Sequence, residues 1–415
     1  MSAESTLRAP LELCYNMRNK MEKIVYLDNN ATTRVAPEVR EAMLPFLGEF
    51  YGNPSSMHAF GGQVAKFVDS AREEVARFLN AEPDEIIFTS CATESDNSAL
   101  RGTADYFGKD LKVVTTAVEH PAILQPCRRL KALGHEVVEL PVNSVGQIDL
   151  GQLENELKGQ KKPVLVSIMY ANNETGVIFP LEDVARICKN HGVLLHTDAV
   201  QAAGKIPIDV KRLPIDMLSM SGHKFHAPKG IGIFYVRRGT KLSPFMLGGH
   251  QERSRRAGTE NVPYIVGLAK ACELARLGME QEAVQLAKLR DRLESGILEK
   301  CPNVRVNGDK LHRLPNTLNI SFEYIEGEAI AYHLSDVGIC ISTGSACASG
   351  SLDPSHVIRA MGVPFTAVHG SVRFSLSRYN TMADIDYVLE KLPPIIGNLR
   401  ELSPFGPNQD VSTFK

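Results

Sequence analysis

Residues 215–226 read Ile-Asp-Met-Leu-Ser-Met-Ser-Gly-His-Lys-Phe-His, an apolar run that leads into a polar segment. The run 215–218 predicts a buried strand, and the polar segment 219–226 follows it directly. A lysine among hydroxyl and imidazole side chains can act as a nucleophile, because partial burial and basic neighbours favour its neutral amine. Lys224 is therefore a candidate to form a Schiff base with a carbonyl cofactor, although most lysines are solvated surface charges.

Similar apolar strands alternate with helical segments before and after this stretch. Strands are predicted at 86–88, 113–116, 164–169, 193–197 and 230–236, and helices at 37–47, 62–79, 95–106 and 181–190. This alternation is typical of right-handed βαβ units, in which parallel strands end at one edge of a sheet. At that edge we expect five side chains to converge: His120, Asn172, Asp198, Gln201 and Lys224.

The segment 89–94 lies between a predicted strand and a predicted helix and is rich in small and hydroxyl residues. Free backbone N–H groups at a helix start, together with the helix dipole, can bind a phosphate. An ordinary helix cap made by Ser90 or Thr93 with the acidic residues after it explains the same residues, and the segment alone favours the cap. It matches neither a Walker motif nor GxGxxG, so it gives little support for nucleotide binding.

A helical region over 262–298 separates two parts of the chain with different patterns. Beyond it, strands at 304–306, 317–322 and 371–376 and helices at 327–335 and 382–392 predict a smaller α+β domain. The domains expected are a flexible tail over 1–20, an N-terminal segment over 21–33 that packs with the small domain, a large domain over 34–282, the small domain over 283–400 and a flexible tail over 401–415. Met21 is a candidate for the true start.

Composition limits the class of protein. The chain has 415 residues, 43% of them hydrophobic, which is enough for two domain cores. Its net charge of -2 gives no bias toward nucleic acid, and no apolar run reaches the roughly 18 residues of a membrane helix. Eight cysteines without a CxxC pair form no disulfide framework in so long a chain. With no apolar signal core at the N-terminus, these features predict a cytoplasmic protein.

One cysteine differs from the others in its surroundings. Cys347 stands in the middle of residues 342–351, an unbroken run of small residues that predicts an exposed, flexible loop. Cys188 and Cys272 fall on predicted helices and are expected to be inert core residues. A flexible loop gives the Cys347 thiol reach, and nearby cations would favour its thiolate.

Together these motifs resemble the cysteine desulfurases of the NifS/IscS type, in class V of the fold-type I pyridoxal-phosphate (PLP) enzymes. The resemblance runs from residue 25 to about residue 392. Its motifs are YLDNNATT at 26–33, EHP at 119–121, ANNETG at 171–176, HTDAVQ at 196–201, SGHK at 221–224, GSAC at 344–347 and RFSL at 373–376. The single-cysteine loop and the DNN sequence at 28–30 are closer to the NifS branch. The chain departs from the family at Cys91 and Ser377, where glycine is common, and residues 1–20 have no counterpart.

The resemblance implies a fold and a cofactor. The fold is α/β, a fold-type I PLP-dependent transferase with a large domain on a mostly parallel seven-stranded sheet flanked by helices, plus a smaller α+β domain. The cofactor is pyridoxal 5'-phosphate, held covalently by Lys224, with Asp198 on its ring nitrogen and His120 stacked on the ring as acid or base. The other implied contacts are Gln201 and Asn172 to the phenolic oxygen, and Ala92, Thr93, Ser221, His223 and the neighbouring subunit's Thr259 to the phosphate.

The resemblance also implies a reaction and partners. Arg373, with Asn172, would bind the carboxylate of L-cysteine, and Cys347 would take the substrate sulfur as a persulfide while L-alanine leaves. The protein would be a homodimer that passes sulfur to an iron–sulfur scaffold of the NifU/IscU kind. No residue would bind a metal directly, and Cys347 is the residue that would meet a cluster held by the scaffold.

Three other functions fit parts of the same pattern. A selenocysteine lyase or another class V enzyme, such as an aminotransferase, would keep Lys224 and Asp198 but would not need Cys347. A non-catalytic assembly platform on the same fold would require the loss of one of these three residues, and all three are present. The pathway that receives the sulfur, nitrogenase maturation or general cluster assembly, is left open.

Overall fold

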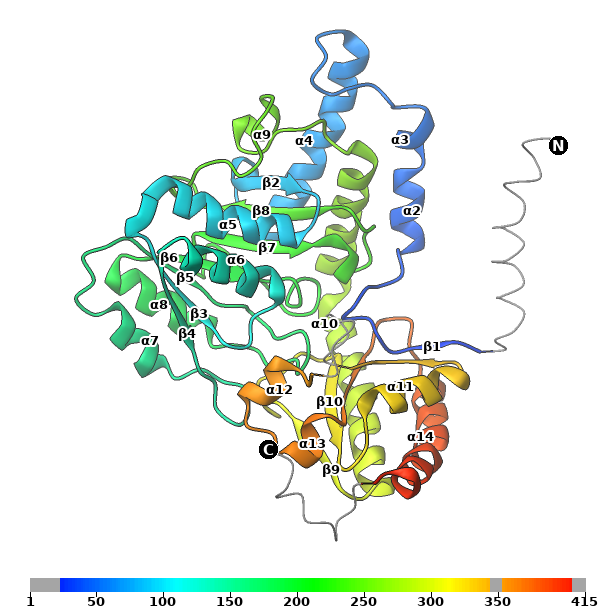
Figure 1. Cartoon of the computed structure of the whole chain (residues 1–415). Coiled ribbons are helices and arrows are strands. Elements are labelled where there is room, and N and C mark those ends of the chain that lie inside the picture. The colour runs from blue at the N-terminus through cyan, green and yellow to red at the C-terminus, as the bar shows by residue number, and fades with distance from the viewer. Residues whose placement is uncertain (1–22, 344–352, 405–415) are drawn as a thin grey trace, which may run out of the picture.

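The computed structural model describes residues 23–343 and 353–404, so Cys347 lies outside the described residues. A large sheet covered by helices lies beside a smaller unit of sheet and helix, and the long helix α10 (Val262–Lys300) runs from one to the other (Figure 1). In the described ranges, no helix combines the length and the apolar composition of a membrane span.

The large sheet has seven strands in the order β2-β8-β7-β6-β5-β3-β4. They are β2 (Ile86–Thr89), β3 (Lys112–Thr116), β4 (Glu136–Leu140), β5 (Val164–Ser167), β6 (Leu194–Asp198), β7 (Met217–Ser221) and β8 (Gly232–Val236). All pairs from β7 to β4 are parallel, and β8 runs antiparallel to its neighbours β2 and β7. The prediction of a mostly parallel seven-stranded sheet is confirmed. Strand β4 was not predicted, and β7 extends three residues into the segment expected to be polar loop.

Helices cover both faces of this sheet, as buried parallel strands require. Besides the first part of α10, the helices of the large unit are α2 (Pro37–Met43), α3 (Pro45–Gly48), α4 (Ala59–Leu79), α5 (Ala92–Phe107), α6 (Pro121–Ala132), α7 (Leu150–Leu157), α8 (Leu181–His191) and α9 (Gln251–Ser254), and its 3₁₀ turns are η1 (Pro83–Glu85), η2 (Gly108–Asp110) and η3 (Gly222–Lys224). The helix predicted over 37–47 is divided at Leu44, because Pro45 starts a new helix.

Successive residues of each strand pack on opposite sides of the sheet. Val166 and Leu218 belong to a cluster that includes side chains of α4, α8 and α10. Their neighbours Leu165 and Met217 belong to another cluster, with side chains of α5 and α6. The strands are therefore apolar on both faces, which explains their nearly continuous hydrophobic sequences.

The smaller unit is built on an antiparallel sheet of order β12-β13-β10-β9. Its strands are β9 (Val304–Asn307), β10 (Thr317–Phe322), β12 (Ser342–Thr343) and β13 (Ser371–Ser375), and its helices are α11 (Gly327–Asp336) and α14 (Met382–Leu402). The short helices α12 (His356–Ala360) and α13 (Phe365–Val368) come between β12 and β13 in the chain, and their buried side chains belong to the core of the large sheet. The N-terminal strand β1 (Val25–Tyr26) pairs in parallel with β11 (Ile339–Cys340). Val25 and Leu27 are buried in the same cluster as Ile320 and Phe374.

Helix α10 contributes to both cores. Its buried side chains up to Ala275 belong to the core of the large sheet, and those from Leu286 onward belong to the core of the smaller unit. The change lies around the predicted domain boundary at 282/283, whose position stays a prediction. At the other end, α14 continues through Pro393 and Pro394 to Leu402, where the sequence predicted an end at residue 392 and a tail from 401. Burial of Ile396 in the second core opposes the helix-breaking effect of the prolines.

Candidate active site

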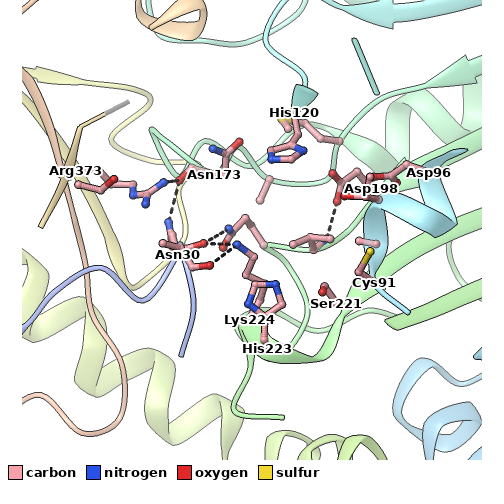
Figure 2. Close-up of a pocket in the computed structure, with 18 of the residues that line it drawn as sticks. Asn30, Cys91, Asp96, His120, Asn173, Asp198, Ser221, His223, Lys224 and Arg373 are labelled. Atoms are coloured by element: carbon pink, nitrogen blue, oxygen red, sulfur yellow. Dashed lines mark hydrogen bonds between the residues drawn. The ribbon is translucent and has the colours of Figure 1, made fainter. Parts of the chain in front are cut away.

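The strand ends of the large sheet meet the smaller unit at a cavity of about 290 Å³. Its wall contains residues from both units, among them Asp198 from β6, Ser221 from β7 and Arg373 from β13 (Figure 2). The sequence-predicted site residues that line it are Ala92, Thr93, His120, Asp198, Gln201, Ser221, His223, Lys224 and Arg373. The convergence expected from parallel strands therefore brings together most of the predicted site.

Lys224 is placed by the end of β7. The strand ends at Ser221, and the single turn η3 carries Lys224 into the cavity wall. Its Nζ donates to the backbone carbonyl of Asn30 at 2.7 Å and to that of Ala31 at 2.8 Å (Figure 2). The amine thus stands at the cavity, held by the loop after β1.

Asp198 supplies a buried carboxylate to the same cavity. It is the last residue of β6, and its Oδ1 accepts a hydrogen bond from the backbone N–H of Val200 at 2.9 Å. Burial raises the pKa of Asp198 to about 6, against the opposing effects of the Val200 N–H and the Lys224 charge. A cationic ring nitrogen beside this carboxylate would favour its ionised form.

His120 caps the helix that follows β3. Its Nδ1 accepts a hydrogen bond from the N–H of Ala122 at 3.1 Å, so in the neutral ring the proton is assigned to Nε2. Burial, with the charges of Lys224 and His356 nearby, lowers the pKa of His120 to about 4. The ring is therefore neutral near pH 7 and forms one wall of the cavity (Figure 2).

The start of α5, at Cys91, lies on the side of the cavity away from Arg373 (Figure 2). Cys91 is the N-cap residue and makes no side-chain cap, while Glu94 accepts from the N–H of Ser90 at 2.8 Å. The helix cap expected from Ser90 or Thr93 is therefore absent at this described terminus, and the first N–H groups of α5 keep their capacity to bind an anion. Thr93, Ser221 and His223 line the same cavity.

Arg373 stands on the side of the cavity formed by the smaller unit. Its Nη2 makes an ion pair with Asp28 at 2.7 Å, and its Nη1 donates to the carbonyl of Asn173 at 3.0 Å. The residue is 6% exposed, and its Nε is buried with no hydrogen-bond partner among the described residues. A guanidinium held in this way has a fixed orientation and can bind a carboxylate through two N–H groups. A ligand carboxylate would take the place of the Asp28 carboxylate.

The prediction for Asn172 has to be corrected. Its Oδ1 accepts from the N–H groups of Glu174 and Thr175 at 2.9 and 3.0 Å, and its Nδ2 donates to the carbonyl of Val118 at 3.0 Å. Because the side chain is used within the turn, Asn172 is not part of the cavity wall. The next residue, Asn173, lines the cavity instead (Figure 2).

Two predicted site residues remain, Thr259 and Cys347. Thr259 is exposed and does not line this cavity, and its assignment to the neighbouring subunit stays a prediction. Cys347 lies outside the described residues, and the chain reaches that gap at Thr343, which lines the cavity.

The sequence reasoning missed residues that complete the wall. Asn30 is 1% exposed, and its backbone carbonyl accepts from both Lys224 and Gln201. Asp96 lies beside Asp198 in Figure 2; its side chain is buried, and its Oδ1 lies 3.7 Å from Nε2 of His196. Signals for both were present, because Asn30 belongs to the DNN motif and Asp96 follows Ala92 by one helical turn.

A family model described as Aminotransferase class-V matches residues 25–388. The chain therefore belongs to the class V aminotransferase family, whose members depend on PLP, and the prediction of this family and cofactor is confirmed.

Curated relatives and solved structures agree with this placement. The chain is 57% identical to a cysteine desulfurase of Nostoc sp. over 92% of this chain and 95% of the relative. It is 54% identical to the cysteine desulfurase NifS of Azotobacter vinelandii, over 93% and 97% of the two chains. A solved NifS-like protein superposes with a TM-score of 0.86 and 43% identity, over 91% of this chain and all of that one.

The residues in the cavity fit PLP. An amine, a buried carboxylate and a neutral imidazole surround the space, and an uncapped helix start lies at one end. The backbone of β8 also approaches α5 closely, since a Cβ on Gly232 would lie 2.7 Å from the carbonyl carbon of Cys91. This donor set matches an aldehyde, a ring nitrogen and a phosphate.

Proposed function

We propose that this protein is a cysteine desulfurase that converts L-cysteine to L-alanine and transfers the sulfur to Cys347. The observation that carries the proposal is the presence of Lys224, Asp198 and Arg373 around one cavity. The names of the 54–57% identical relatives support the same activity, and none of those quoted above points to selenocysteine lyase.

PLP, when bound, supplies a ring that withdraws electrons from the bonds of the substrate. Lys224 would hold it covalently through Nζ and would move protons at the substrate Cα. Asp198 would keep the ring nitrogen protonated, and His120 would lie against the ring with Nε2 available for proton transfer. The remaining contacts proposed are Gln201 to the phenolic oxygen and Ala92, Thr93, Ser221 and His223 to the phosphate.

The substrate would be oriented by Arg373, whose guanidinium already holds one carboxylate, that of Asp28. We place Asn173 beside it in the role first assigned to Asn172, because Asn173 lines the cavity and the Asn172 amide is bound within a turn.

Sulfur transfer would take place on the Cys347 thiol. The thiolate attacks the substrate sulfur, an S–S bond forms, and the Cβ–S bond of cysteine breaks. The bonding electrons pass to Cβ, which gains a proton, so that L-cysteine and Cys347–SH yield L-alanine and Cys347–S–SH. No external oxidant or reductant is required for this balance. Ser342 and Thr343, which line the cavity, connect it to the cysteine segment.

We further propose the partners that the family resemblance implies. The protein would act as a homodimer in which Thr259 completes the partner's site, and it would donate sulfur to an iron–sulfur scaffold of the NifU/IscU kind. The cysteines of the described residues are free thiols, which supports a reducing compartment such as the cytoplasm.

The decisive experiment measures alanine formation and the mass of the Cys347 peptide after L-cysteine is added. We expect the wild type to form alanine and to gain one sulfur on that peptide. Cys347→Ala should bind PLP but form no alanine, and Cys340→Ala is the matched control with normal activity. Lys224→Ala should lose the borohydride-fixed cofactor. Normal alanine formation by Cys347→Ala would overturn the persulfide step.

A further inference from the structure

Lys205 is a buried lysine next to the cavity that no sequence motif assigned. It is 9% exposed, and its Nζ donates to Gln201 Oε1 at 2.8 Å and to the Gln201 backbone carbonyl at 3.2 Å. Burial, with the charges of Lys224 and Arg373 nearby, lowers the pKa of Lys205 to about 7. Because both partners are acceptors and an amine keeps N–H groups in either protonation state, Lys205 is the donor in both contacts.

The nitrogen of the Gln201 side-chain amide also has a fixed partner. Its Nε2 donates at 3.0 Å to the backbone carbonyl of Asn30, the same carbonyl that accepts from Lys224 at 2.7 Å. A carbonyl can only accept and the Lys205 amine donates, so the two contacts allow a single orientation of the amide. The NH₂ group then faces the side of Asn30 and Lys224, and Gln201 lines the cavity there.

We propose that Lys205 is a positioning residue for the cofactor, which keeps the NH₂ group of Gln201 directed to the cavity by holding its side-chain oxygen. The inference rests on the proposed contact between Gln201 and the phenolic oxygen. That oxygen carries negative charge and needs a donor. If the Gln201 amide were reversed, its Oε1 would face the phenolic oxygen, and two acceptors that face each other repel.

The first test titrates the apoprotein with PLP and follows binding by visible absorbance at one fixed pH. Lys205→Met removes the donor and keeps a side chain of similar length. We expect an approximately tenfold loss of PLP affinity, the equivalent of one hydrogen bond to a charged group. The absorbance spectrum should change in the same way as that of Gln201→Leu.

The double variant tests whether Lys205 acts through Gln201. If it does, Gln201→Leu with Lys205→Met should bind PLP no more weakly than Gln201→Leu alone, because the second substitution has nothing left to position. Losses that multiply to about a hundredfold would overturn the proposal. A wild-type spectrum and affinity in Lys205→Met would overturn it as well.

The matched control is Lys112→Met. Lys112 is also buried, at 2% exposed, but pairs with Glu136 and Glu156 at the start of β3. We expect it to keep the spectrum and the PLP affinity, even if stability falls. Should Lys205→Met fail to fold, Lys205→Leu, which also lacks a donor, enters the same double-variant comparison with the same criterion.

The two single variants distinguish the role of Lys205 from the proposed Gln201 contact and from the proposed desulfurase activity. An unchanged Gln201→Leu would remove the Gln201 contact and the Lys205 inference together, while alanine formation from cysteine would still support the desulfurase. A changed Gln201→Leu with an unchanged Lys205→Met would remove the Lys205 inference alone.

Discussion

At the scale of single residues, two adjacent asparagines are expected to have different tasks. Asn172→Ala removes the acceptor for the N–H groups of Glu174 and Thr175, and we expect a loss of about 2 kcal/mol in the free energy of unfolding. Asn173→Ala should stay within about 0.5 kcal/mol of the wild type and should lower alanine formation. Urea unfolding and the alanine assay on both variants measure this, and the reverse pattern would restore the original assignment to Asn172.

Arg373 is expected to act on substrate binding. A lysine at this position is a point charge and cannot contact both Asp28 and the Asn173 carbonyl as the guanidinium does. Arg373→Lys should therefore raise the KM for L-cysteine more than tenfold, with a smaller effect on kcat. Steady-state kinetics gives both constants, and an unchanged KM would move the carboxylate site elsewhere.

The sequence could predict the cavity residues that follow strands, because strand ends of a parallel sheet meet at one edge. Lys224, Asp198 and His120 belong to this group. It could not decide between Asn172 and Asn173, because the turn hydrogen bonds that use one of them depend on the folded backbone. Nor could it place Asp28 against Arg373, since that pair joins positions 345 residues apart.

At the scale of elements, the close approach of β8 to α5 depends on Gly232. A Cβ there would lie 2.7 Å from the Cys91 carbonyl carbon and 2.8 Å from the Met220 carbonyl oxygen, both backbone atoms. We expect Gly232→Ala to cost roughly 1–3 kcal/mol of stability and to weaken PLP binding, because the helix start must shift. The control is Gly62→Ala in α4, where a Cβ meets no atom within 4 Å and should not destabilise the helix. Urea unfolding and PLP titration compare the two.

Glu119, just after β3, should make stability depend on pH. Its Oε1 accepts from the Met169 N–H and the Thr116 hydroxyl, and its Oε2 is buried with no hydrogen-bond partner in the part of the chain that the structure describes. Burial raises the pKa of Glu119 to about 8. Between about pH 4.5 and 8 the folded state keeps a proton that the unfolded chain releases, so Glu119 lowers stability as pH rises through this window.

Glu119→Gln lacks this titration. Its stability relative to the wild type should therefore increase from pH 5 to pH 8, by at most about 1.4 kcal/mol per pH unit. Urea unfolding of both proteins at several pH values measures the difference, and a constant or decreasing difference would contradict the protonated carboxyl.

Most elements of the large sheet could be predicted, because strands buried on both faces are recognisable by their continuous apolar sequence. The edge strand β4 could not be predicted, since its apolar pattern is short: Val137 and Val138 are half-buried and stand between two exposed glutamates. The C-terminal part of α14 was also missed, because local propensity predicts an end at Pro393 while core packing continues the helix.

At the scale of the whole molecule, the proposed role of Thr259 would make the site incomplete in one chain. Ala92, Thr93, Ser221 and His223 surround the proposed phosphate position, but Thr259 is exposed and lies outside this cavity. If Thr259 serves the partner's site, a C₂ dimer contains two equal composite sites, each with Lys224 from one chain and Thr259 from the other.

Mixed dimers test this arrangement. Lys224→Ala chains and Thr259→Ala chains are each expected to be defective alone. In a dimer that contains one of each, the site with intact Lys224 receives intact Thr259 from its partner, and the second site carries both defects. Random exchange after partial unfolding should therefore restore about one quarter of the wild-type desulfurase activity. If Thr259 acted within its own chain, every site with an intact Lys224 would carry the Thr259 defect, and mixing would restore nothing. Recovery after mixing therefore decides between a site shared by two chains and a site within one.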